Sequence, residues 1–214
     1  MAISGANRSA RRKSSGAHRK VLDKGSDGVE ANARFTGSIA AVLLVLLAAE
    51  GLTVLRVRAL LTPHVFIGVL LIPPILLKIG STGYRFVRYY AGSPAYRQKG
   101  PPPALLRLLG PFVVVLTVVL FASGVALLFV GPGLRQNLLL LHKASFVLWF
   151  GAMAIHVLSH LLDTARLAPR DFYWRTRKQV AGAGLRQWTI VASLAAGLLL
   201  AALSVGHVSH FLAG

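Results

Sequence analysis

The chain has 214 residues and contains no cysteine. The absence of cysteine excludes disulfide bonds, cysteine-ligated iron–sulfur clusters and covalently attached c-type haem. Acidic residues are scarce, with 6 Asp and Glu against 24 Lys and Arg, so the formal net charge is +18. Such a charge raises the question of nucleic acid. The basic residues mostly lie between apolar runs, however, where they act as topology signals, so we expect no nucleic-acid binding.

Long hydrophobic runs dominate the composition. Hydrophobic residues make up 55% of the chain, and the mean hydropathy is +0.63. A helix needs about 20 apolar residues to cross a hydrocarbon core of roughly 30 Å. Five runs meet this requirement: residues 37–57, 63–79, 108–130, 137–162 and 188–208. The sequence therefore predicts an all-α, polytopic transmembrane helix bundle over residues 37–214, preceded by a disordered basic cytoplasmic tail over residues 1–36.

Two further features refine this prediction. Pro73 and Pro74 should kink the second span, because each ring removes a helical donor and clashes with the preceding turn. Twenty Lys and Arg residues fall in the tail, between spans two and three, and between spans four and five. Only four fall on the opposite side: Arg56, Arg58, Arg135 and Lys143. Since Lys and Arg concentrate in cytoplasmic loops, we expect an inner (plasma) membrane protein with its N-terminus in the cytoplasm and its C-terminus outside.

Six of the 7 histidines lie within spans or at their ends. A histidine in hydrocarbon is a functional candidate by default, although it can also simply bridge two helices. His64 and His142 begin spans two and four, which run in the same direction, so both should lie at similar depth near the outer face. Two imidazoles on different helices can bind one haem iron from opposite sides. Gly68, one turn after His64, would make room for a flat macrocycle.

A third histidine shares the helix of His142. His156 follows fourteen residues later, which is about 21 Å along a helix and close to four full turns. Both rings should therefore face the same way, an arrangement that suits two stacked haems and that any apolar stripe would also produce. His156 and His160 could alternatively hold zinc or iron as an i, i+4 pair, but a metalloprotease would need Glu where Val157 stands.

These histidines and the segment HVFIGVLLIPPILLKIGSTGYRFVRYYAG make residues 37–162 similar to a known family. The chain resembles the bacterial cytochrome b membrane subunits of formate dehydrogenases and nickel–iron hydrogenases, and small actinobacterial cytochrome b-like relatives. The resemblance implies a four-helix core with two b haems, to which this chain adds a fifth C-terminal span. His142 and His156 match the family's paired helix, and His64 matches the outer partner. The family's inner partner is missing, because residues 35–38 read Phe-Thr-Gly-Ser, so we expect one haem b and keep a second at His156 as the alternative.

The resemblance implies an electron-transfer subunit of an oxidoreductase complex rather than a stand-alone enzyme. Electrons would pass between a membrane quinone and an extracytoplasmic oxidoreductase, such as a molybdopterin enzyme. Glu50, in the outer half of span one, could relay protons to the quinone or hydrogen-bond another span. Arg56, Arg58, Arg135 and Lys143 could pair with haem propionates or anchor the interface.

A different class of function also fits the sequence. A haem-free membrane scaffold or transporter could use the same histidines to bridge helices or to relay protons. Such a protein would not require His64 and His142 to lie at equal depth. Apart from the alternative metal pair with His156, the sequence assigns no role to His160, and it assigns none to His207 or His210.

Overall fold

A computed structural model describes the backbone of residues 3–98, 100, 104–172 and 183–213, and the side chains of residues 28–98, 100, 106–159 and 184–208. Every regular element in this part of the chain is a helix, so the predicted all-α class is confirmed. The helices, in chain order, are α1 (Ile3–Leu55), α2 (Leu61–Tyr90), α3 (Pro94–Gln98), α4 (Ala104–Leu127), α5 (Pro132–Phe172) and α7 (Ala183–Ala213).

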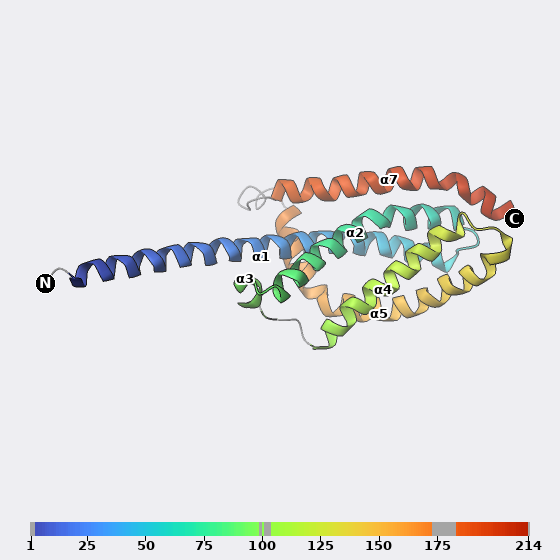
Figure 1. The fold of residues 1–214 in the computed structure, drawn as a ribbon. Helices are drawn as coiled ribbons and strands as arrows, with labels where there is room; N and C mark the ends of the chain where they lie inside the picture. Colours follow the sequence, from blue (N-terminus) through green and yellow to red (C-terminus); the bar gives the residue numbers. More distant parts are fainter. Residues whose placement is uncertain (1–2, 99, 101–103, 173–182, 214) are drawn as a thin grey trace.

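Five of these helices are long and apolar enough to cross a membrane, which confirms the predicted bundle. The qualifying stretches are Gly28–Leu55, Leu61–Tyr90, Leu106–Leu127, Pro132–Ser159 and Gly184–Val208. The shortest has 22 residues, and a helix of that length extends about 33 Å, enough for a hydrocarbon core of roughly 30 Å. The long helices alternate in direction, so the two ends of the chain lie at opposite ends of the bundle (Figure 1).

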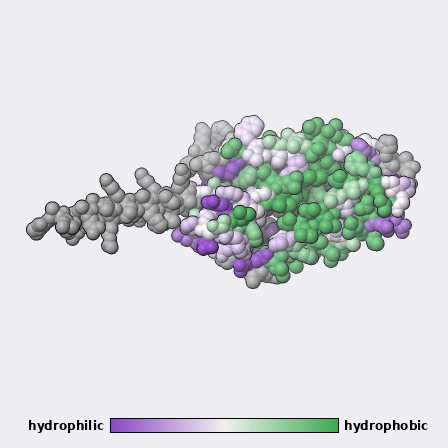
Figure 2. All heavy atoms as spheres, viewed as in Figure 1, coloured by the Kyte–Doolittle hydropathy of each residue, from purple (hydrophilic) through white to green (hydrophobic). Residues whose placement is uncertain are grey.

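The surface of the bundle matches a lipid environment. The face in Figure 2 is hydrophobic across its middle and more hydrophilic toward its two ends. Large apolar side chains such as Leu52, Leu76 and Val147 are more than half exposed. Water would disfavour so much contiguous apolar surface, whereas lipid tails are as apolar as leucine. The chain is therefore a polytopic helical membrane protein.

The first helix differs from the prediction at its N-terminal end. Residues 3–36, for which the sequence predicted a disordered tail, belong to α1 and continue without a break into the first span. This region contains no proline and is rich in Ala, Arg and Lys, residues with high helix propensity. Once the span provides a helical nucleus, each added residue forms one further hydrogen bond, so the helix can propagate outward. Similarly, α2 continues past its predicted end at residue 79 to Tyr90.

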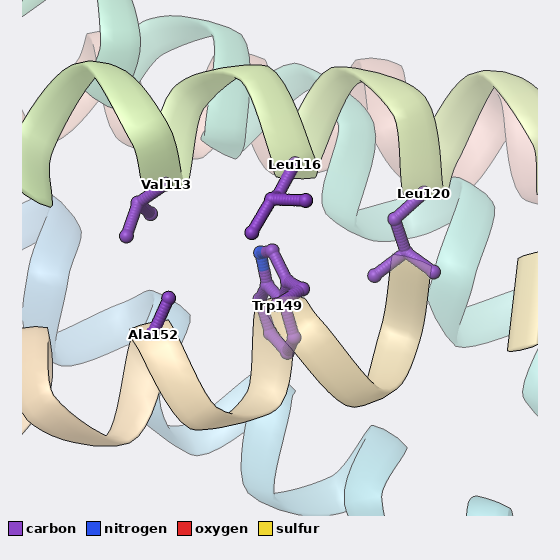
Figure 3. Packing of buried hydrophobic residues seen from close by; sticks show 5 residues of the cluster. All are labelled: Val113, Leu116, Leu120, Trp149 and Ala152. Carbon is purple, nitrogen blue, oxygen red and sulfur yellow. The ribbon is translucent and has the colours of Figure 1, made fainter. Parts of the chain in front are cut away.

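One packing seam joins α4 to α5. Five buried residues form it, namely Val113, Leu116 and Leu120 from α4 and Trp149 and Ala152 from α5 (Figure 3). The indole Nε1 of Trp149 donates to the Thr117 hydroxyl at 2.8 Å, which itself donates to the Val113 carbonyl at 2.7 Å. The buried indole N–H is thus satisfied, as buried polar groups require. Because the seam reaches Leu120, it positions the part of α4 that faces His142.

A second cluster joins α1, α2 and α7. Its buried members are Ile39 and Leu43 from α1, Leu71 from α2 and Ile190 from α7. The fifth span therefore packs mainly along α2, on the opposite side of the bundle from the α4–α5 seam (Figure 1). α7 therefore lies at the edge of the bundle, against α2.

The contact between α2 and α7 depends on a proline and a glycine. α2 stays helical through Pro73 and Pro74, but Pro74 has no N–H, so the Leu70 carbonyl loses its usual helical donor. A Cβ built on Gly197 would lie 2.4 Å from that carbonyl oxygen. The hydrogen that takes the place of this Cβ therefore faces the freed oxygen, in a weak Cα–H···O contact. Only glycine allows α7 to approach this closely.

Polar side chains tie α1 to α2 at the end of the bundle where the N-terminal extension leaves. The Lys78 ammonium donates to the Thr36 carbonyl at 3.0 Å, and the hydroxyls of Thr36 and Ser81 lie 3.1 Å apart. The Asn32 amide also donates to the Ser81 carbonyl at 3.4 Å. Together with the apolar contacts, these bonds fix how α1 is rotated against α2, and hence which α1 side chains face His64 at the other end.

Candidate functional site

His64 and His142, predicted to lie at one depth, come together in the structure. His64 lies in the first turn of α2, His142 lies on α5, and their ring centroids are 6.4 Å apart with the ring planes inclined at 77°. Both side chains are half-buried. The pair lies toward the end of the bundle that carries the α1–α2 turn, and its polar partners come from α1 and α4.

The Nδ1 atom of His64 faces two acceptors on α1. It lies 2.8 Å from the Glu50 carboxylate and 3.1 Å from the Thr53 hydroxyl oxygen. The Thr53 hydroxyl donates to the Glu50 carbonyl at 2.6 Å and lies 3.2 Å from the second carboxylate oxygen. The Thr53 hydroxyl already donates its hydrogen to the Glu50 carbonyl, so it can only accept from His64. We therefore assign a hydrogen to Nδ1 of His64, which leaves Nε2 with a free lone pair.

His142 is held in the same way by α4. Its Nδ1 lies 3.1 Å from the Leu120 carbonyl and 3.1 Å from the Ser123 hydroxyl oxygen. The Ser123 hydroxyl donates to the Leu120 carbonyl at 3.0 Å. A carbonyl only accepts, so Nδ1 of His142 also carries a hydrogen and its Nε2 also keeps a lone pair. The two rings therefore present the same nitrogen for a ligand, but only His64 has a carboxylate partner.

Glu50 is unusual in its surroundings. It is the only acidic residue between Glu30 and Asp163. Its side chain is 15% exposed, and that of His64 is 21% exposed. A carboxylate at this depth is costly unless it is paired and hydrogen-bonded. The contacts with His64 and Thr53 satisfy that requirement.

Two glycines lie against the site. A Cβ on Gly124 would lie 3.0 Å from Cε1 of His142, so glycine at this position lets the imidazole pack against α4. The nearest atom to a Cβ on Gly68 is an oxygen of the Glu50 carboxylate, at 3.5 Å. Gly68, expected to face a macrocycle, therefore lies beside the carboxylate that binds His64.

The expected outer cations lie at the same end of the bundle. Arg56 and Arg58 are exposed in the turn between α1 and α2. Lys143 is exposed next to His142, and Arg135 is half-buried in the first turn of α5. Their pairing with propionates stays a prediction.

The other histidines lie apart from this pair. His156 is half-buried on α5, fourteen residues beyond His142. The α1 segment at residues 35–38, where the family's inner partner would stand, contacts the far end of α2 through Thr36. His207 contacts the Phe129 ring at 4.9 Å. The side chains of His160 and His210 lie outside the described residues.

Sequence reasoning missed the residues that hold the imidazoles. Thr53 lies three residues after Glu50 on the same helix face, a spacing that could have singled it out. Ser123 and Gly124 are a small polar pair of the kind that lets transmembrane helices approach closely. No pattern in the sequence indicated that the Leu120 carbonyl would accept a hydrogen bond from His142.

Two imidazoles from different helices are the donor type that a bis-imidazole haem requires. Metal–imidazole bonds are about 2.0–2.1 Å long, so two rings bound on opposite sides of one metal have centroids about 6 Å apart, close to the observed 6.4 Å. Within the described residues, no group of three or more His, Cys, Asp or Glu side chains is placed to hold a metal ion. Two protein ligands suit haem, whose macrocycle supplies the other four.

The cluster offers two imidazoles from different helices and a half-buried carboxylate. These groups can hold a metal centre or pass a proton. No protein-family model, characterised protein or solved structure matches the chain.

Proposed function

We propose that this chain is a membrane b-type cytochrome that transfers electrons between the quinone pool and an extracytoplasmic redox partner. His64 and His142 would be the two axial ligands of one haem b. The observation that carries the proposal is their pairing from different helices, with ring centroids 6.4 Å apart. Nδ1 of His64 contacts Glu50 on α1, and Nδ1 of His142 contacts the Leu120 carbonyl on α4. The Nε2 lone pairs of both rings are therefore left to bind the iron.

Haem b, when bound, supplies a one-electron carrier, while the protein supplies ligands, burial and orientation. Glu50 and Thr53 hold His64 in one tautomer, and the Leu120 carbonyl does the same for His142. Partners of this kind orient ligating histidines and tune their basicity. The apolar seam that ends at Leu120 lies next to the α4 segment that contacts His142, and burial of this kind influences the reduction potential of a haem.

The partners and the orientation follow from the same proposal. The charge distribution supports a plasma-membrane protein with a cytoplasmic N-terminus. The pair would then lie nearer the outer face, where an exported oxidoreductase, such as a molybdopterin enzyme, can exchange electrons with it. A quinone reaches the site through the lipid, and Glu50 is the candidate to exchange protons with it. Arg56, Arg58 and Lys143 would pair with the haem propionates.

Removal of either ligand tests the assignment. The purified protein is expected to be red, with the reduced-minus-oxidised spectrum of a low-spin b haem and about one haem per chain in a pyridine haemochrome assay. His64→Ala and His142→Ala should each abolish the low-spin spectrum, because a single axial ligand cannot keep the iron six-coordinate. His207→Ala, which removes a histidine outside the pair, should leave the spectrum unchanged. A normal spectrum and haem content in either ligand variant would show that the assignment is wrong.

A haem-free proton relay is the second candidate function. It is favoured by the 2.8 Å contact between Glu50 and His64, since carboxylate–histidine chains are the usual components of intramembrane proton pathways. If this candidate is right, the protein stays colourless when expressed with an ample supply of haem precursor. Proteoliposomes containing it would then conduct protons, and Glu50→Gln would abolish the conductance.

A further inference from the structure

The two imidazoles differ in the charge of their hydrogen-bond acceptors. Nδ1 of His64 donates to a carboxylate at 2.8 Å, whereas Nδ1 of His142 donates to the neutral Leu120 carbonyl at 3.1 Å. Hydrogen bonds to ionised acceptors are shorter and roughly twice as strong as neutral ones. The proton on His64 is therefore drawn further from its ring, which leaves more electron density on the opposite nitrogen.

Glu50 also has few ways to balance its charge. Among the described residues its ion-pair partner is His64, and the nearby Thr53 offers only a hydroxyl. A buried carboxylate is stabilised by a positive charge close by. An oxidised iron–porphyrin core carries one more positive charge than the reduced core, so a carboxylate one ligand away favours the oxidised form.

From this geometry we propose that Glu50 is a positioning residue that acts through His64. It holds the His64 tautomer that exposes Nε2, and its charge makes His64 the stronger donor of the two ligands, which lowers the reduction potential of the haem. Thr53 supports this role, because its hydroxyl contacts both the carboxylate, at 3.2 Å, and the imidazole, at 3.1 Å. The inference rests on the proposed haem function and adds a residue that sets the potential.

The test is a redox titration of the full-length protein carrying haem, with potential and haem content measured on the same samples. Glu50→Gln keeps the shape of the side chain and an acceptor for Nδ1 but removes the charge. It should retain about one haem per chain and the low-spin spectrum, and its midpoint potential should shift upward. His207→Ala is the control, because His207 lies outside the pair, against the Phe129 ring. Its midpoint potential should stay close to that of the wild type.

Each result decides between defined outcomes. An unchanged potential in Glu50→Gln, with haem retained, overturns the inference and leaves the proposed function intact. If Glu50→Gln loses haem, Thr53→Val decides the question, because it loosens the carboxylate without removing it. A smaller upward shift in that variant supports the inference, and an unshifted potential overturns it. A colourless wild-type protein would overturn the proposed function and the inference together.

Discussion

At the scale of single residues, Glu50 and His64 depend on each other. The carboxylate lies in an apolar part of the bundle and is stabilised by the imidazole at 2.8 Å. Removing one member of a buried pair leaves the other group desolvated and uncompensated. His64→Ala therefore removes a ligand and also leaves the Glu50 carboxylate without its ion-pair partner. His142→Ala leaves only neutral groups on α4 without their partner. For this reason, haem loss in the His64 variant must be measured per folded chain.

His156 gives a prediction at the same scale. His156→Ala should leave the haem content near one per chain, because no histidine of α1 stands near residues 35–38 to complete a second bis-histidine site. The loss of stability should be small, since an interhelical hydrogen bond in a membrane is worth only about 0.6 kcal/mol on average. The pyridine haemochrome ratio of the wild type and the variant provides the measurement. A ratio near two in the wild type that falls to one in the variant would restore the two-haem arrangement of the family.

The candidate site shows which parts of this arrangement are predictable. The equal depth of His64 and His142 follows from the parallel direction of spans two and four. The contact of Glu50 with His64 does not, because it depends on the rotation of α1 against α2. That rotation is determined by packing at Ile39 and Leu71 and by the polar bonds around Ser81, and hydropathy carries no information about it.

At the scale of elements, α7 packs against α2 at the point where α2 lacks one helical hydrogen bond. Pro74 frees the Leu70 carbonyl inside the bundle. α7 contacts this carbonyl through a glycine that brings the two backbones together. The prolines were visible in the sequence, and so was the fifth span. The contact between Gly197 and the Leu70 carbonyl was not visible, because Gly197 is one of several small residues in an apolar run. Only the position of α7 along α2 determines which of them faces that carbonyl.

This interface predicts the effect of a single methyl group. Gly197→Ala would place its Cβ 2.4 Å from the Leu70 oxygen and 3.1 Å from the Leu70 side chain, so α7 must move away. We expect destabilisation of about 1–3 kcal/mol, as for other overpacked sites, seen as a lower midpoint of thermal unfolding in detergent. Gly206→Ala on the same helix is the control, because a Cβ there meets nothing within 4 Å. Equal unfolding midpoints for the two variants would contradict this account of the interface.

At the scale of the whole molecule, five spans place the two ends of the chain on opposite sides of the bundle (Figure 1). The number of spans was predictable, because each apolar window exceeds the length that a bilayer requires. The helical extension at the N-terminus was not, since a hydropathy profile does not register helix propensity outside the bilayer. Because the number of spans is odd, the two termini lie on opposite sides of the membrane. Locating one terminus therefore also locates the other.

The distribution of Lys and Arg predicts the orientation of both termini. Twenty of the 24 Lys and Arg residues lie in segments that share one side with the N-terminus, and positively charged loops remain in the cytoplasm. Alkaline phosphatase, which is active only after export, should therefore be active when fused after Gly214. The same enzyme fused at Gly100, between α3 and α4, should be inactive, whereas green fluorescent protein fused there should fluoresce. Cytoplasmic localisation of the Gly214 fusion would reverse the proposed orientation. In that case His64 and His142 would lie nearer the cytoplasmic face, and the redox partner would have to be sought there.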